Sequence, residues 1–320
     1  MPMALTAEEY GSEHFIWADS DIQLVWYSEF SEQDKDKLRN WMKNGLNLVR
    51  HLNGQLPRKE IRFHIQKKET DTKSPVPYAQ VLRDGVQGVH FWVDTRKPYY
   101  DFIRDWTFTH ELVHLFIDYP GDKDVWLSEG LATYYQNILL VRGGLLTERD
   151  FWRRFVEGLE RGRDDSNYDG YPLQAVSEHM RGIGAYMRVY WSGALYFLQG
   201  SIALLEPIQH SDDTLNQESV KASDDKQALK GASNNLEQVL VNLITCCQNK
   251  GKPLEGIELV KKLDVLAKTN WFETHYEQFQ YVDKMPEYES VLERLGIQKR
   301  GGYLYLTPEN ELRRKILFRR

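Results

Sequence analysis

Two histidines four residues apart, in the segment His110-Glu111-Leu112-Val113-His114, constrain this chain more than any other feature. Apolar neighbours predict a helix here, on which positions i and i+4 differ by about 40° and lie one turn apart. Both imidazoles then project from one face, where each can reach a single zinc ion at about 2.0–2.1 Å. Because buried polar side chains cost free energy without a partner, the spacing predicts a metal site.

The helix expected next along the chain supplies a candidate third ligand. Pro120-Gly121 ends the first helix, and a short acidic loop lets the chain reverse before the segment from Trp126 to Tyr135. Glu129 lies early in that segment and completes a set of two histidines and one carboxylate, which leaves a fourth zinc position open. Thr133, one turn later, is a candidate for a hydrogen bond to the outer nitrogen of a zinc-binding histidine.

Chance is the competing explanation for the two histidines. With this composition, a His-Glu-x-x-His segment arises in roughly one or two of a hundred random chains of this length. Histidine and glutamate on a solvated helix face would then need no metal. The second helix weighs against this alternative, because it offers a carboxylate where a zinc site needs one.

Composition narrows the classes of protein that fit. The 320 residues carry 41 Lys and Arg against 47 Asp and Glu, a net charge of −6, which argues against nucleic-acid binding through a basic face. No apolar run approaches the ~20 residues of a membrane span, and no signal peptide is visible, so a cytoplasmic protein is the default expectation. A processed, exported form is also compatible with the sequence. The oligomeric state is not determined.

The two cysteines, Cys246 and Cys247, are adjacent. They cannot crosslink distant segments or supply a four-cysteine zinc site, so histidine and carboxylate must hold any metal. Their position in an apolar helical stretch predicts buried packing rather than redox chemistry.

Periodicity predicts a small α/β front half and a helical back half. Strands are expected at 22–27, 61–65 and 88–94, with a helix beginning after Ser31 and a loop over 67–79. Helical spacing predicts further helices over 101–118, 126–141, 147–161, 188–206, 235–249, 254–268 and 286–295.

Two segments together resemble the gluzincin metallopeptidases: His110 to His114, and Trp126-Leu-Ser-Glu-Gly-Leu-Ala-Thr-Tyr-Tyr135. The likeness is greatest to the glycyl aminopeptidase-like family and more distant to the aminopeptidase N-like enzymes. Tyr190-Trp-Ser-Gly-Ala-Leu195 is similar to a segment that opens a later helix in these families, and residues 281–297 resemble the end of their helical domain. The resemblance covers roughly residues 20–297.

This resemblance implies roles for four residues. His110, His114 and Glu129 would bind one zinc ion per chain. Glu111 would be the general base that takes a proton from the attacking water. The chemistry implied is hydrolysis of a peptide bond.

Two further residues are candidate oxyanion donors. By the resemblance, Tyr190 would donate a hydrogen bond to the negative charge that develops on the scissile carbonyl. Without the family, a packed aromatic at a helix start explains Tyr190 equally well. His179 is a rival donor, and an exposed loop histidine is the simpler explanation of it.

The resemblance also implies an α+β fold with a thermolysin-like zincin lobe. Residues 1–145 would hold a small, mostly antiparallel sheet, the active-site helices and the zinc site. Residues 146–320 would form a mostly helical lobe, with the cleft between the two lobes. The polar stretch 209–235 would be a loop within the second lobe.

Substrate range is less constrained. The aminopeptidase N-like enzymes hold the free amino group of the substrate with a glutamate in an upstream motif. Residues 88–94, the expected edge strand, contain no glutamate, although they could still pair with an extended peptide. Exopeptidase specificity therefore does not carry over from these enzymes. From the zinc site and the resemblance as a whole, we expect a zinc metallopeptidase acting on peptides or proteins, aminopeptidase-like in specificity. The alternatives are a zinc endopeptidase on the same site and a catalytically silent zincin-fold binding protein.

Overall fold

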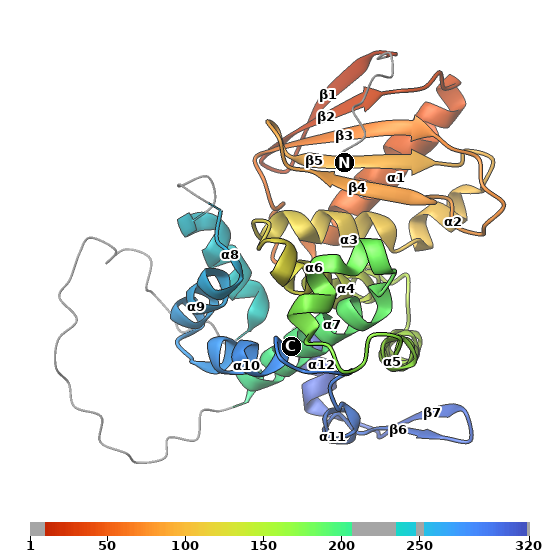
Figure 1. Ribbon diagram of the computed structural model, residues 1–320. Coiled ribbons are helices and arrows are strands. Elements are labelled where there is room, and N and C mark those ends of the chain that lie inside the picture. The colour runs from red at the N-terminus through yellow and green to blue at the C-terminus, as the bar shows by residue number, and fades with distance from the viewer. Residues whose placement is uncertain (1–9, 207–234, 248–252, 319–320) are drawn as a thin grey trace, which may run out of the picture.

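A computed structural model describes residues 10–206, 235–247 and 253–318. Figure 1 shows a small sheet at one end of the molecule, stacked helices beside it, and a two-stranded hairpin toward the opposite end. Residues 209–234 of the predicted polar loop lie outside the described residues. The fold is a mixed α+β arrangement with a five-stranded sheet, a two-stranded sheet and many helices.

The larger sheet has five strands in the order β1-β2-β3-β5-β4. Their bounds are β1 Ser12–Trp17, β2 Ser20–Trp26, β3 Glu60–Lys67, β4 Tyr78–Leu82 and β5 Gly88–Val93. The pairs β2–β3 and β3–β5 are parallel, while β1–β2 and β4–β5 are antiparallel. The expected mostly antiparallel sheet is therefore wrong. Helix α1 (Glu32–Arg50) connects β2 to β3, which makes this pair parallel. Strand β4 lies at the edge of the sheet next to β5, so that β5 pairs with β3 in the parallel direction.

Helix α1 covers one face of this sheet and builds the core of the front half. Its first turn is capped by Ser31, whose hydroxyl accepts a hydrogen bond from the Asp34 amide at 3.1 Å. Trp41 of α1 contacts Phe91 of β5 and Phe108, each at 5.2 Å between ring centroids. Burial of these rings fixes the helices that follow against the sheet.

The remaining elements are mostly helices. They are α2 Tyr99–Arg104, α3 Thr107–Val113, η1 His114–Phe116, η2 Asp122–Asp124, α4 Val125–Arg142, α5 Glu148–Asp164, α6 Leu173–Ile183, α7 Tyr186–Leu205, α8 Leu236–Cys247, α9 Gly256–Ala267, α10 Trp271–Phe279, α11 Glu289–Arg294, β6 Ile297–Arg300, β7 Tyr303–Leu306 and α12 Glu311–Phe318. The predictions of α4, α5, α7, α8, α9 and α11 are confirmed, whereas α6, α10, α12 and four of the strands were not predicted. None of the helices in the described part of the chain combines the length and apolarity that a bilayer span requires.

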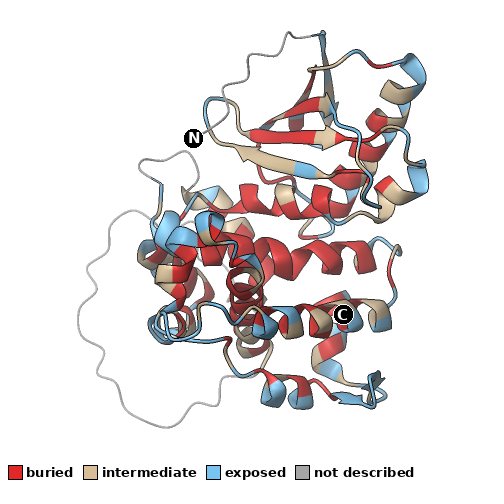
Figure 2. Ribbon diagram, turned by 45° about the vertical axis from the view of Figure 1, so that its right-hand side comes forward, coloured by how far each residue is buried: buried red, intermediate tan, exposed pale blue. Residues whose placement is uncertain are grey.

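Helix α4 is the centre of the molecule. Every residue from Val125 to Val141 is buried, and Figure 2 shows buried residues along the central helices with exposed residues outside them. Helix α4 lies before the predicted lobe boundary at residue 145, and α7, which packs along it, lies after that boundary. The division into two lobes stays a prediction.

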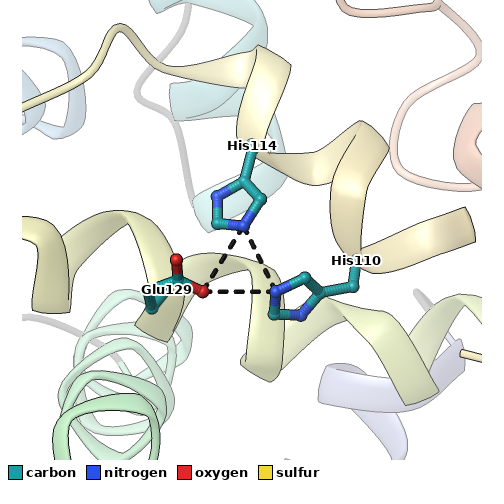
Figure 3. A group of neighbouring side chains, drawn as sticks. All are labelled: His110, His114 and Glu129. Carbon is teal, nitrogen blue, oxygen red and sulfur yellow. Dashed lines mark hydrogen bonds and ion pairs between the residues drawn. The ribbon is translucent and has the colours of Figure 1, made fainter. Parts of the chain in front are cut away.

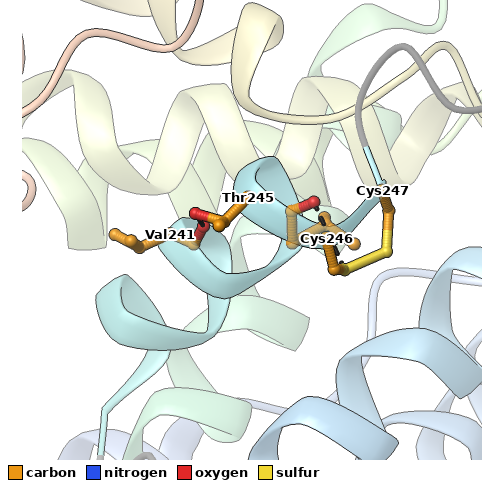
Figure 4. Close-up of a disulfide and its surroundings, with 5 residues drawn as sticks. Val241, Thr245, Cys246 and Cys247 are labelled. Atoms are coloured by element: carbon orange, nitrogen blue, oxygen red, sulfur yellow. Dashed lines mark hydrogen bonds between the residues drawn. A yellow bond between two sulfur atoms is a disulfide. The ribbon is translucent and has the colours of Figure 1, made fainter. Parts of the chain in front are cut away.

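The two cysteines are joined to each other at the end of α8 (Figure 4). The prediction that they are buried packing residues is wrong, because both are only partly buried and they form a disulfide. Adjacent thiols meet here without any tertiary rearrangement, so the bond links no distant segments. Cys247 is partly buried against the hydrophobic core.

The sheet face opposite α1 carries a row of stacked rings. The ring of His90 stacks on Trp92 at 3.7 Å between centroids, and that of His64 stacks on Tyr27 at 5.0 Å. Both histidines are buried, and His64 Nδ1 and His90 Nε2 have no hydrogen-bond partner among the described residues. Burial lowers the pKa of each histidine to about 4.

These two histidines predict acid sensitivity of the fold. In the unfolded chain each protonates near pH 6.5, but in the folded protein only near 4, so unfolding takes up protons between these values. We expect the contribution of each histidine to the free energy of unfolding to be level above about pH 7 and to fall by about 2–3 kcal/mol by pH 4.5. Urea unfolding at several pH values measures this, and His90→Phe should flatten the slope. The same substitution at exposed His179 should not, and an unchanged slope in His90→Phe would contradict the assignment.

Candidate metal centre

Helix α3 carries His110 and begins just after Asp105, the residue at which the preceding helix α2 ends. Asp105 has extended backbone, and its carboxylate accepts a hydrogen bond from the Thr107 amide at 2.8 Å. This contact breaks the single helix expected over 101–118 and starts α3 anew. Helix α3 then passes into the short 3₁₀ helix η1, so His110 and His114 lie at the end of one element and the start of the next, both buried.

A close helix crossing positions the carboxylate. At Gly121, a φ of +95° lets the chain turn into η2 and α4. Helices α4 and α7 cross at Gly130 and Gly193, where a Cβ on Gly130 would lie 2.3 Å from the Gly193 backbone. Any larger residue would push the helices apart. The crossing therefore holds Glu129, beside Gly130, close to Tyr190, one turn before Gly193.

Three ligand atoms converge at this point (Figure 3). His110 Nε2 lies 3.2 Å from His114 Nε2 and 3.3 Å from Glu129 Oε2, and the third separation, His114 Nε2 to Glu129 Oε2, is 3.5 Å. Zinc bonds of about 2.0–2.1 Å in a tetrahedron separate neighbouring ligand atoms by about 3.3–3.4 Å. The residues present thus fit a zinc ion, because the three atoms have the spacing of three tetrahedral corners.

The outer nitrogens of both rings are also occupied. His110 Nδ1 lies 2.9 Å from Gln136 Oε1, and His114 Nδ1 lies 2.9 Å from Ser128 Oγ. With Nδ1–H donating to these oxygens, each ring keeps its Nε2 lone pair for a metal. The predicted contact from Thr133 is wrong. Its hydroxyl is buried and has no hydrogen-bond partner among the described residues.

The electrostatics of the group favour a cation. Burial opposes charge on Glu129, but His114 and His110 outweigh it and hold the pKa of Glu129 far below its usual range. Burial likewise opposes charge on His110, yet the hydrogen bond and charge of Glu129 raise its pKa overall. The carboxylate is therefore ionised in a buried site, which a bound metal would stabilise.

Glu111 lies on the wall of the same site. It lines a cavity of about 630 Å³ together with His110, His114 and Glu129. Burial raises the pKa of Glu111, although the two histidines oppose that rise. A carboxylate with a raised pKa is a better proton acceptor, as a general base near a metal requires.

Tyr190 also reaches the site, from helix α7. Its ring stacks on His110 at 5.9 Å between centroids, and it lines the same cavity. Burial and then the charge of Glu129 raise the pKa of Tyr190, so the phenol stays protonated and can donate a hydrogen bond. His179 is exposed on α6 and does not line this cavity, so the structure does not bring the rival donor to the site.

The edge strand beside the site is not the one expected. Residues 88–94 include β5, which pairs with β3 on one side and β4 on the other. The free edge belongs to β4, whose residues Tyr78, Gln80 and Val81 line the cavity. This correction follows from strand order, which depends on pairing between distant segments. Strand β4 also contains no glutamate.

Sequence reasoning missed Ser128, Gln136 and Arg83. Ser128 comes directly before Glu129, and Gln136 follows Glu129 by two helical turns. Their positions next to a candidate ligand, on the same helix, could have marked both as hydrogen-bond partners of the histidines. Arg83, after β4, donates to the carbonyl oxygens of His114 and Ile117 at 2.9 and 3.0 Å and tethers the end of η1. Burial lowers the pKa of Arg83 to about 10.

Two solved structures are similar to this chain. An aminopeptidase N family protein from Idiomarina loihiensis matches 91% of this chain and 50% of its own, at 15% identity and a TM-score of 0.57. The chain has the fold of that protein. An M1 zinc metallopeptidase from Deinococcus radiodurans matches 87% of this chain and 52% of its own, at 14% identity and a TM-score of 0.48. The chain thus spans about half the length of these proteins. No family model and no curated protein sequence matches it.

Proposed function

We propose that this protein is a zinc-dependent metallopeptidase of the gluzincin type, with His110, His114 and Glu129 as zinc ligands. The observation that carries the proposal is the spacing of three buried ligand atoms, 3.2–3.5 Å apart, with both outer ring nitrogens occupied. The fold of an aminopeptidase N family protein supports it. A thermolysin-like catalytic lobe and a likeness to the glycyl aminopeptidases belong to the same proposal.

The mechanism assigns one task to each residue. Zinc, when bound, supplies Lewis acidity that polarises a carbonyl and acidifies water. Glu111 accepts the proton of the attacking water and passes it to the leaving amine. Tyr190 donates its hydroxyl hydrogen to the oxygen that becomes negative as the carbonyl is attacked. Gln136 and Ser128 keep the two imidazoles oriented throughout.

The free edge of β4 suits an extended peptide. Four of its residues line the cavity, and a substrate strand can pair with such an edge. We propose aminopeptidase-like cleavage, with endopeptidase cleavage as the alternative on the same site. A silent zincin-fold binding protein would have no use for a raised-pKa carboxylate at Glu111.

The direct test is metal analysis of the purified protein combined with digestion of a mixed peptide library. We expect about one zinc per chain and cleavage products that disappear after chelation. Peptides with free and acetylated N-termini separate the two modes of cleavage. Equal rates on both would reject aminopeptidase specificity, and zinc without any cleavage would leave the silent binding protein.

Tyr190→Phe should lower kcat by about 10²–10³ and leave the zinc content unchanged, because it removes one donor to the developing oxyanion. Steady-state kinetics and metal analysis measure both quantities. Tyr186→Phe is the matched comparison, since Tyr186 lines the same cavity and its ring contacts Tyr190. We expect a kcat near wild type for it. A larger loss at Tyr186 than at Tyr190 would reassign the donor.

A further inference from the structure

A second cavity, of about 390 Å³, lies behind Tyr190. Tyr190 lines both this cavity and the larger one. The wall of the second cavity also includes Gln136, the hydrogen-bond partner of His110 Nδ1. Trp106 lines it too, and its ring lies edge-on to that of His110 at 5.1 Å between centroids. The second cavity therefore adjoins the metal centre on the outer side of His110.

Two arginines line this second cavity, and they lie two helical turns apart on α5. Arg154 is partly buried and donates to Asn137 Oδ1 at 3.1 Å, while Arg161 is exposed and lies 5.6 Å from the ring of Trp191. Neither has a carboxylate within ion-pair distance in the part of the chain that the structure describes. Glu157 also lines the cavity, but it is engaged by Arg153 at 3.1 Å. The wall thus carries two guanidinium groups with donors to spare.

A buried hydroxyl in the same wall also lacks a partner. Thr133 lines the second cavity and is only 3% exposed, and its Oγ1 makes no hydrogen bond within the described residues. A buried hydroxyl without a partner is costly, so most such groups have a hydrogen-bond partner in the protein, in water or in a ligand. This observation is independent of the arginines and adds an unsatisfied hydroxyl to a residue of the cavity wall.

We propose that this cavity binds a carboxylate of the peptide substrate, with Arg154 and Arg161 supplying the charge and Thr133 a hydrogen bond. A planar guanidinium suits a carboxylate because it offers paired parallel donors. The carboxylate is either the C-terminus of a short peptide or an Asp or Glu side chain near the scissile bond. The inference rests on the proposed peptidase function and names its substrate class.

The test measures binding, so that it does not depend on turnover. Zinc-loaded Glu111→Gln protein is titrated calorimetrically with tetra-alanine as the free acid and as the C-terminal amide. A second arm uses amidated tetrapeptides that carry Glu or Gln at each position in turn. We expect the peptide with the carboxylate to bind at least tenfold more tightly than its amide counterpart in one of the two arms. A preference in the first arm identifies a C-terminal carboxylate, and one in the second arm identifies a side-chain carboxylate.

Three substitutions test whether residues of the second cavity cause the preference for the carboxylate. In the same background, Arg154→Gln and Arg161→Gln should each reduce the preference for the acid at least threefold, as expected for the loss of one charge-assisted contact. Arg149→Gln is the matched control, because Arg149 is exposed on α5 and does not line the cavity. Thr133→Val should raise the melting temperature of the free protein and weaken acid binding, whereas a purely structural hydroxyl would not affect the acid preference.

Two results would overturn the inference. One is equal affinity for acid and amide in both arms, and the other is an acid preference that survives both arginine substitutions. Neither outcome bears on hydrolysis, which is measured separately with the wild-type protein. A protein that prefers acids but cleaves no peptide would refute the peptidase and leave the carboxylate site standing.

Discussion

Replacing Glu111 by glutamine is expected to lower kcat by about 10³-fold while zinc stays bound. The amide has the shape of the carboxylate but cannot accept the proton of the attacking water, and general-base catalysis contributes about 10²–10⁴-fold. Glu111 lies on the cavity wall beside the two histidines, and burial raises its pKa toward the range of an effective base. Single-turnover kinetics on the best library peptide measure the loss.

Zinc content and peptide binding are the controls for this variant. Both should equal those of the wild type, because Glu111 is not among the three converging ligand atoms. An active Glu111→Gln protein would show that another group takes the proton. A variant that is inactive because it has lost zinc would instead make Glu111 a ligand or a support of one.

Replacing Glu129 by glutamine should remove both zinc and activity. The neutral amide no longer supplies the ionised ligand that His110 and His114 stabilise in this buried site. We expect zinc affinity to fall by more than the ~10–100-fold that loss of an outer partner costs. Competition with a coloured chelator measures the affinity. The melting temperature should also lose its dependence on added zinc.

Gln136→Leu and Ser128→Ala provide the graded comparison. Each removes one oxygen bound to an outer ring nitrogen and leaves the three ligand atoms in place. Zinc affinity should fall by about 10–100-fold in each, between the wild type and Glu129→Gln. If Glu129→Gln retained more zinc than either variant, Glu129 would not be the third ligand.

Much of the candidate site was predictable because its geometry is local. The i, i+4 spacing of His110 and His114 places both rings on one face of an α-helix, and this relation holds here because the 3₁₀ helix begins only at His114. The hairpin of consecutive helices then limits where Glu129 can lie. Short-range spacing in the sequence was sufficient for both.

Packing between distant segments decided the rest. The parallel pairing of β3 with β5, and hence the identity of β4 as the free edge, depends on a crossover and a strand insertion that periodicity does not report. The contacts of His110 and His114 with Gln136 and Ser128, in place of Thr133, depend on how α3 packs on α4.

The sequence by itself predicted the three side chains of the candidate metal centre, because helix geometry relates His110 to His114 and the next helix offers Glu129. Only the tertiary structure decided what surrounds this group. The Gly130–Gly193 crossing brings Tyr190 to the site, and the packing of α5 beside α4 and α7 places Arg154 and Arg161 in the second cavity. Tyr190 and the two arginines are distant in sequence from His110. Only the packing of their helices against one another brings them close to it.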